Sequence, residues 1–217
     1  MIKYQNLVIE KFNHDTIMVK GDKVIYFDPF QINMINMPRA DIVFITHHHQ
    51  DHCSADDLEK IIKNDTWLVA PPSCGPILSR FQQDKQWLKP GESGELVGVK
   101  IDAVPAYNID KFRSPGQLFH PKEEGGLGYV IEIDGVKLYF AGDTDNIAEL
   151  KELEPVDIAF LPVSGTYVMT AKEAADATEV IRSDIFIPMH YGAIVGDKSQ
   201  AEQFQSMVKN AEVRILD

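Results

Sequence analysis

The segment His47-x-His49-x-Asp51-His52 is the feature that most constrains this chain, because it places four potential metal ligands within six positions. Neutral imidazole combined with carboxylate suits Zn²⁺ and its neighbours in the first transition row. If the segment is extended, the two-residue period turns His47, His49 and Asp51 the same way and His52 elsewhere. We therefore expect His47 and His49 to hold a first ion. Asp51 and His52 would turn toward a second ion, with water between the two.

The surroundings of this segment argue against a surface histidine cluster or a tag remnant. A tag would lie at a terminus, whereas this run follows the apolar stretch 41–46 and precedes Ser54-Ala-Asp-Asp57. A serine with an aspartate three residues later is typical of a helix start. Layered α/β proteins build their sites where a strand end leads into a helix start.

Length and charge limit the fold and the partners. With 217 residues, 44% of them hydrophobic, the chain can bury one full core, so we expect a single domain over residues 1–217. The balance of 21 basic and 33 acidic residues gives a net charge of −12, which leaves no broad basic surface for nucleic acid or an anionic membrane. We expect a small-molecule substrate, and the sequence does not decide the oligomeric state.

The first residues of the chain and its cysteine content indicate a cellular compartment. The opening Met-Ile-Lys-Tyr-Gln-Asn does not have the pattern of a signal peptide, and no stretch approaches transmembrane length. Two cysteines are too few for a disulfide framework and fit a reducing compartment. We therefore expect a cytoplasmic protein.

The predicted elements are strands first, and then alternating strands and helices. Strands are predicted over 2–12, 16–20, 23–28, 41–46, 66–70 and 95–106, and helices over 54–63 and 75–83. Residues 108–126 form a loop too long to be a mere connection. Asp134-Gly135 is predicted to turn a hairpin between 129–133 and 136–141. After it, helices over 145–153, 170–181 and 199–210 alternate with strands over 156–163, 184–189 and 213–216.

Three candidate ligands directly follow apolar strands of this prediction. They are His47, Asp143 and His190. Strands of one sheet that run the same way would bring these ends to one edge, so we expect the three side chains to converge. Taken alone, Gly142-Asp143 could be an ordinary turn and His190 a hydrogen-bonded core histidine.

The candidate ligands and their order resemble the motifs of the metallo-β-lactamase fold superfamily. The Thr-His-x-His-x-Asp-His run, then Gly-Asp-Thr, and then a histidine after the penultimate strand occur in that order over nearly the whole chain. Asp28-Pro29 and the compact length most resemble the branch of small metal-dependent hydrolases related to L-ascorbate-6-phosphate lactonase. The resemblance implies an α/β (α+β) fold, a four-layer αββα sandwich of two mixed β-sheets flanked by helices, with two metals at one sheet edge.

The resemblance also implies a ligand set. His47, His49 and a third histidine would hold the first ion, Asp143 would bridge, and the second ion would take Asp51, His52 and His190. The third histidine would lie near residues 104–108, where this chain has none.

His120 is the only histidine between His52 and His190, and the long loop could fold it back into the site. We expect His120 to be the third ligand, with Asn108 as a weaker oxygen ligand if it does not reach. His14 is not assigned to metal, and it is either a hydrogen-bond partner of the site or a turn residue. His48 should point away.

Two divalent ions per chain, Zn²⁺ first and Mn²⁺ second, would lower the pKa of a bridging water and polarise the group that is attacked. Asp51 is the expected catalytic residue, which orients the nucleophile and carries a proton to the leaving group. Tyr167 and Tyr191 follow strand ends and are candidates for substrate binding, although packing explains both equally well.

The expected function is hydrolysis of a small ester or lactone. A phosphodiesterase acting on a small phosphodiester is the alternative, since a nuclease would need a basic stripe that is absent from the sequence. The third possible function is that of a di-iron redox protein or a metal sensor. Redox relatives in this superfamily typically carry Glu where His49 stands, which favours Zn²⁺ or Mn²⁺ and hydrolysis.

Overall fold

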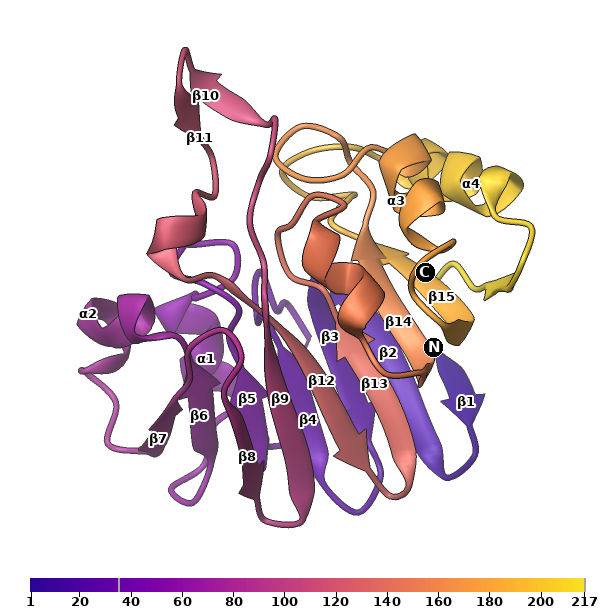
Figure 1. The fold of residues 1–217 in the computed structure, drawn as a ribbon. Helices are drawn as coiled ribbons and strands as arrows, with labels where there is room; N and C mark the ends of the chain where they lie inside the picture. The colour runs from indigo at the N-terminus through magenta and orange to yellow at the C-terminus, as the bar shows by residue number, and fades with distance from the viewer. Residues whose placement is uncertain (35, 217) are drawn as a thin grey trace.

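Two seven-stranded β-sheets form the middle of the protein (Figure 1). The computed structural model describes residues 1–34 and 36–216. The N-terminal sheet has the order β1 (Ile2–Tyr4), β2 (Leu7–Asn13), β3 (Thr16–Lys20), β4 (Val24–Phe27), β5 (Ile42–Phe44), β6 (Trp67–Ala70) and β7 (Asp84–Trp87). The C-terminal sheet has the order β16 (Glu212–Val213), β15 (Ser183–Met189), β14 (Val156–Pro162), β13 (Val136–Phe140), β12 (Leu127–Ile133), β9 (Val99–Pro105) and β8 (Ser93–Leu96).

Each sheet has an antiparallel half and a parallel half. Strands β1 to β4 pair antiparallel and β4 to β7 parallel. In the other sheet β8, β9, β12 and β13 pair antiparallel, and β13 to β16 parallel. Parallel neighbours need crossover connections. For all the parallel pairs except β4 and β5 the crossover contains a helix: α1 (Ala55–Ile61), η1 (Pro72–Cys74) with α2 (Gly75–Leu78), η3 (Ala148–Glu152), α3 (Ala171–Ala177) and α4 (Lys198–Met207).

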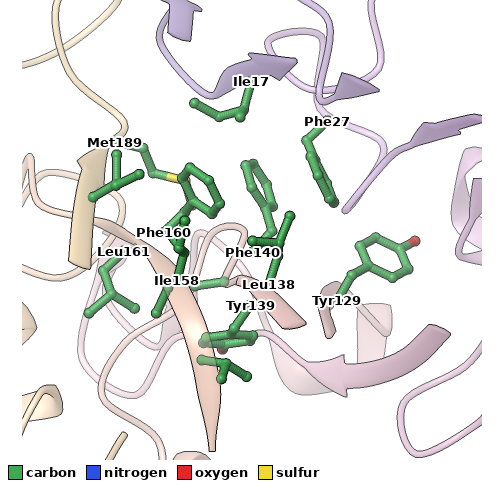
Figure 2. Close-up of a cluster of buried hydrophobic side chains, with 14 of the residues drawn as sticks. Ile17, Phe27, Tyr129, Leu138, Tyr139, Phe140, Ile158, Phe160, Leu161 and Met189 are labelled. Atoms are coloured by element: carbon green, nitrogen blue, oxygen red, sulfur yellow. The ribbon is translucent and has the colours of Figure 1, made fainter. Parts of the chain in front are cut away.

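Alternating side chains explain why the sheets stack and why helices cover their outer faces. In β4, Phe27 belongs to the core between the sheets, whereas its neighbour Tyr26 packs in a second core with Leu58 of α1. Figure 2 shows Phe27 of one sheet facing Phe140 of the other, and their ring centroids are 4.5 Å apart. Helices α3 and α4 lie beside β14 and β15 (Figure 1). The predicted sandwich of two mixed sheets flanked by helices is therefore confirmed.

Replacing Phe140→Ala is expected to destabilise the protein by about 3–5 kcal/mol, because the ring fills the space between the two sheets and leaves a cavity when removed. Phe140 is 0% exposed and also contacts Phe160 at a centroid distance of 6.0 Å. Urea unfolding monitored by circular dichroism measures the change. The matched control is Phe112→Ala, since Phe112 is 52% exposed and its loss should cost less than about 0.5 kcal/mol. Equal losses in the two variants would contradict this account of the core.

Several local predictions are confirmed. Ser54 caps α1 by accepting from the Asp57 amide, and Thr170 forms a capping box with Glu173 at α3. The hairpin of β12 and β13 turns at Asp134-Gly135, both with positive φ as expected. No helix in the described part of the chain is long and apolar enough to cross a membrane.

Two long predicted strands are in fact hairpins. The strand expected over 2–12 is broken at Gln5 with φ 50°, and the strand expected over 95–106 turns at Val97-Gly98 with φ 45° and 88°. Gln5 and Val97 carry no turn signal, because such positive φ is usual for glycine, asparagine or aspartate. Both breaks exist because the two halves of each predicted strand pair with each other, β1 with β2 and β8 with β9.

Other boundaries also differ from the prediction. Strand β7 was not expected, the helix predicted over 75–83 ends at Leu78, and the one predicted over 145–153 is the 3₁₀ segment η3. The loop 108–126 carries a small hairpin, β10 (Phe112–Ser114) and β11 (Gln117–Leu118), followed by η2 (Lys122–Glu124). Figure 1 shows this hairpin standing beyond the ends of the two sheets.

Candidate metal centre

Both sheets contribute to the place where the predicted ligands converge. The segment 47–52 follows β5 of the N-terminal sheet, whereas Asp143 and His190 follow β13 and β15 of the C-terminal sheet. The expectation that strands of one sheet supply all three ends is therefore wrong. The two sheets are joined at this point, since the Tyr129 hydroxyl donates to the Ile45 carbonyl at 2.8 Å.

The ligand segment is a tight turn and not an extended strand. Strand β5 ends at Phe44, and the amides of His52 and Cys53 both donate to the His49 carbonyl, at 3.1 and 2.8 Å. The start of the turn is fixed by Asp28, whose carboxylate accepts from the Thr46 amide at 2.8 Å and from its hydroxyl at 2.7 Å. The segment is therefore not extended, the condition we considered, and the turn itself directs the ligands into two groups.

The first group consists of three imidazole nitrogens. His47 Nε2 and His120 Nε2 lie 3.0 and 3.1 Å from His49 Nδ1. Ligands about 2.0–2.1 Å from one ion in a tetrahedral arrangement lie roughly 3.3 Å apart. Both distances are close to the spacing of neighbouring ligands on one ion, and donor atoms of all three histidines lie within 4.8 Å of one another. The structure brings His120 into the group in which we expected it.

The second group contains Asp51, His52 and His190, and the structure adds His14 to it. One donor atom from each of these side chains lies within 4.8 Å of the others. His52 Nε2 is 3.5 Å from Asp51 Oδ2. This mixture of imidazole and carboxylate is again a typical ligand set for Zn²⁺, Mn²⁺ or iron.

Asp143 lies between the two groups and faces both. Its Oδ2 is 3.2 Å from His120 Nε2 on one side and 3.2 Å from His190 Nε2 on the other. Its Oδ1 is 3.4 Å from His52 Nε2. A carboxylate in this position can bridge two ions.

Several buried side-chain atoms that could bind a metal have no hydrogen-bond partner within residues 1–34 and 36–216. They include His52 Nε2, His190 Nε2 and Asp143 Oδ1. Buried polar atoms are normally paired, because an unpaired one loses its hydration without compensation. Two divalent cations would satisfy these atoms, so the residues fit the metals that the ligand motif implies.

The histidines of the first group are held in the neutral form that binds metal. Burial lowers the pKa of His47 well below its ordinary value and lowers the pKa of His120 to about 4. For Asp143, burial opposes ionisation, but His190 and His52 hold the pKa of this carboxyl well below its usual range. The centre therefore combines neutral imidazoles with an ionised carboxylate.

His52 differs from the first group. Burial disfavours its cation, but Asp143 and Asp28 raise the pKa of His52 well above the ordinary value. These two carboxylates favour the protonated ring, so an ion that binds Nε2 would have to replace a proton.

A partner on the second ring nitrogen orients most of these histidines. The partner atoms are Thr46 Oγ1 at 3.0 Å from His47 Nδ1, Asp28 Oδ2 at 2.8 Å from His52 Nδ1, Ser164 Oγ at 2.9 Å from His190 Nδ1 and Asn108 Oδ1 at 3.0 Å from His120 Nδ1. Such contacts fix which nitrogen faces the metal and make it a better ligand.

Asn108 holds His120 and does not itself enter the first group. Its Oδ1 accepts from the His120 amide at 2.9 Å, and its amide group donates to the Tyr167 carbonyl at 2.9 Å. The oxygen we considered as an alternative ligand is thus used to orient the histidine.

A cleft of about 330 Å³ opens above the centre, and Tyr167 is in its wall. The lining residues are His49, Gln50, Asp51, Arg113, Phe119, His120, Asp143, Tyr167 and Ile194. Tyr191 is elsewhere: it is 5% exposed, and its hydroxyl donates to the Leu216 carbonyl at 3.4 Å. Its predicted role in substrate binding is corrected to packing, because the ring turns into the core instead of the cleft.

Sequence reasoning missed the contributions of Asp28 and Asp15, and it left His14 as either a hydrogen-bond partner of the site or a turn residue; all three are 0% exposed. Asp28 follows β4, the parallel neighbour of β5, so the rule that pointed to His47 could have found it. His14 and Asp15 lie in the turn between antiparallel β2 and β3, where no local pattern marks a site. His48 lies beside the ligands without joining either group.

Comparison with known proteins gives a consistent picture. The Beta-lactamase superfamily domain matches residues 9–190. The chain is similar to UPF0173 metal-dependent hydrolases of Archaeoglobus fulgidus (28% identical, covering 94% of this chain and 93% of that protein) and Thermococcus onnurineus (33%, 94% and 93%). It is also similar to the crystal structure of a presumed metal-dependent hydrolase from Parabacteroides distasonis, with a TM-score of 0.84, 33% identity, and coverage of 97% of this chain and 94% of that one.

Proposed function

Because the chain belongs to the Beta-lactamase superfamily and to its UPF0173 metal-dependent hydrolases, we propose that its centre binds two divalent ions, zinc or manganese, and hydrolyses a small ester or lactone. The observation that carries this proposal is the position of Asp143. Its carboxylate lies 3.2 Å from a nitrogen of each ligand group, at the base of a cleft. A site with two adjacent ions and open space above them is suited to hydrolysis.

The ions would supply an activated water molecule and polarise the group that is attacked. The chain supplies position and proton transfer. Asp51 lines the cleft with a side chain that is 18% exposed, so its carboxylate can orient the nucleophile and pass a proton to the leaving group. Tyr167 and Arg113 on the cleft wall can bind polar groups of the substrate, while Phe119 and Ile194 provide apolar contact.

The size of the cleft favours a small substrate, as expected for a relative of the L-ascorbate-6-phosphate lactonase branch. A small phosphodiester would use the same two ions and is the second candidate. The histidine at position 49 argues against a di-iron redox protein, because redox relatives typically carry glutamate at that position.

A substrate screen tests the reaction class. Metal-reconstituted protein is incubated with lactones, thioesters and phosphodiesters, and the products are followed by mass spectrometry. We expect turnover of lactones or other small esters that disappears in Asp143→Asn. Turnover of phosphodiesters alone would favour the second candidate. Stoichiometric iron with visible absorbance and no hydrolysis would favour a redox protein.

Removal of metal is expected to lower the melting temperature. A ligand that binds only the folded state stabilises it by about 2.7 kcal/mol when present at a hundred times its dissociation constant. Differential scanning calorimetry with and without a chelator measures the shift, and elemental analysis after reconstitution should give close to two ions per chain. Occupancy that stays below one ion at saturating metal would contradict the two-metal centre.

A further inference from the structure

His14 is a buried histidine at the metal centre that the ligand motifs do not include. It lies in the turn between β2 and β3, it is 0% exposed, and its φ is 48°. Residues other than glycine seldom adopt this left-handed conformation unless their surroundings fix it. Here Thr16 fixes the turn, because its hydroxyl donates to the Asp28 carbonyl at 3.0 Å and accepts from the Phe30 amide at 2.8 Å.

The turn places the His14 ring in the second ligand group. His14 Nε2 is 3.4 Å from Asp51 Oδ2, and its ring centroid is 4.1 Å from that of His190. Donor atoms of His14, Asp51, His52 and His190 all lie within 4.8 Å of one another. Ligands about 2.1 Å from an ion are at most roughly 4.2 Å apart. Only a small adjustment is needed for all four to surround one ion.

The hydrogen bonding of His14 also points to a metal. Neither of its ring nitrogens has a hydrogen-bond partner among the described residues. By contrast, the Nδ1 atoms of His52 and His190 are held by Asp28 and Ser164. The contact of His14 Nε2 with Asp51 Oδ2, at 3.4 Å, is long and does not have the geometry of a full hydrogen bond, and Nδ1 has no partner among the described residues. An ion in front of Nε2 would satisfy that nitrogen.

The neighbouring Asp15 also reaches this centre, since one of its carboxylate oxygens lies within 4.8 Å of donor atoms of His52, Asp143 and His190. Its Oδ2 lies 3.8 Å from His52 Nδ1, the nitrogen that is bound to Asp28. His52 faces Asp51 and Asp143 with the opposite nitrogen, Nε2. His14 differs from Asp15 in that its donor atom also lies within 4.8 Å of Asp51, the carboxylate that lines the cleft.

We infer that His14 is an additional protein ligand of the second ion, an inference that rests on the two-metal centre proposed above. The second ion then has five protein ligands, His14, Asp51, His52, His190 and Asp143, and the first has four, His47, His49, His120 and Asp143. The larger set holds the second ion more tightly. The first ion, with fewer protein ligands, is then expected to be the first to leave on chelation.

Cobalt titration of variants tests this role independently of activity. Co²⁺ is added to metal-free wild-type protein, His14→Ala and His48→Ala in competition with a chelator, and visible absorption is recorded. We expect His14→Ala to bind one ion as the wild type does and the other at least about tenfold more weakly, with a changed spectrum. His48→Ala is the matched control and should bind both ions normally. Wild-type affinities and spectrum in His14→Ala would overturn the inference.

His14→Gln separates a ligand from a hydrogen-bond donor. The glutamine amide can still donate toward Asp51 but lacks the imidazole nitrogen. If His14 is a ligand, this variant should lose affinity as His14→Ala does. Restoration of the wild-type affinity and spectrum by glutamine would show that His14 acts only through Asp51, and the inference would fail.

A measurement on the wild type covers the case in which the variants do not fold. With ¹⁵N-labelled histidine and bound Co²⁺, large contact shifts are expected for all of the seven histidines except His48. A His14 signal without such a shift would overturn its role while leaving the two-metal centre in place. Wild-type protein that binds no ion at all would refute the proposed function itself, and with it this inference.

Discussion

Asp143→Asn is expected to abolish hydrolysis while leaving the fold intact. The carboxylate is 3% exposed and lies within 3.4 Å of nitrogens of His120, His190 and His52. Asparagine has the same shape but no charge, so it cannot neutralise two cations at once. We expect turnover to fall by at least about a thousandfold, equivalent to roughly 4 kcal/mol in the barrier.

The measurement combines kinetics, elemental analysis and circular dichroism. Asp102→Asn is the matched control, because Asp102 lies on β9 and its exposed side chain bonds only to Ser93 in the described structure. The control should keep wild-type activity and metal content. If Asp143→Asn retained both as well, Asp143 would be an ordinary turn residue and the bridge would have to be abandoned.

His120→Ala is expected to have the second large effect. The substitution removes the nitrogen that lies 3.1 Å from His49 Nδ1, one of three that would hold the first ion, and an incomplete coordination shell binds metal weakly. We expect loss of the first ion at ordinary metal concentrations and a sharp fall in turnover, while the second ion stays bound. Isothermal titration with Zn²⁺, together with kinetics, measures both effects.

Asn108→Ala is the informative comparison for this variant. Asn108 orients His120 through two contacts of its side-chain oxygen, at 2.9 and 3.0 Å, and does not enter the nitrogen cluster. Loss of such an orienting partner typically costs 10–100-fold in metal affinity or activity, which is much less than loss of a ligand. A severe defect in Asn108→Ala beside a mild one in His120→Ala would reverse the assignment and make the asparagine the ligand.

Several local features of the fold could be predicted from the sequence. Ser54, Thr170 and Asp134-Gly135 act through hydrogen bonds and backbone preferences within a few residues, so the caps and the hairpin could be predicted. The turns at Gln5 and Val97 could not, because strand pairing there overrides local preference.

The sequence by itself also indicated a metal centre, because His47, His49, Asp51 and His52 are metal-binding residue types at close spacing. Only the tertiary structure decided how the site is assembled. It joins the ends of strands from two sheets at Asp143, folds His120 back from 71 positions beyond His49, and turns Tyr191 into the core. It also brings in His14 and Asp28, whose nearest partners in the site are distant in sequence. Ligand type is a property of residues, whereas their convergence depends on sheet packing and long-range contacts that no local pattern specifies.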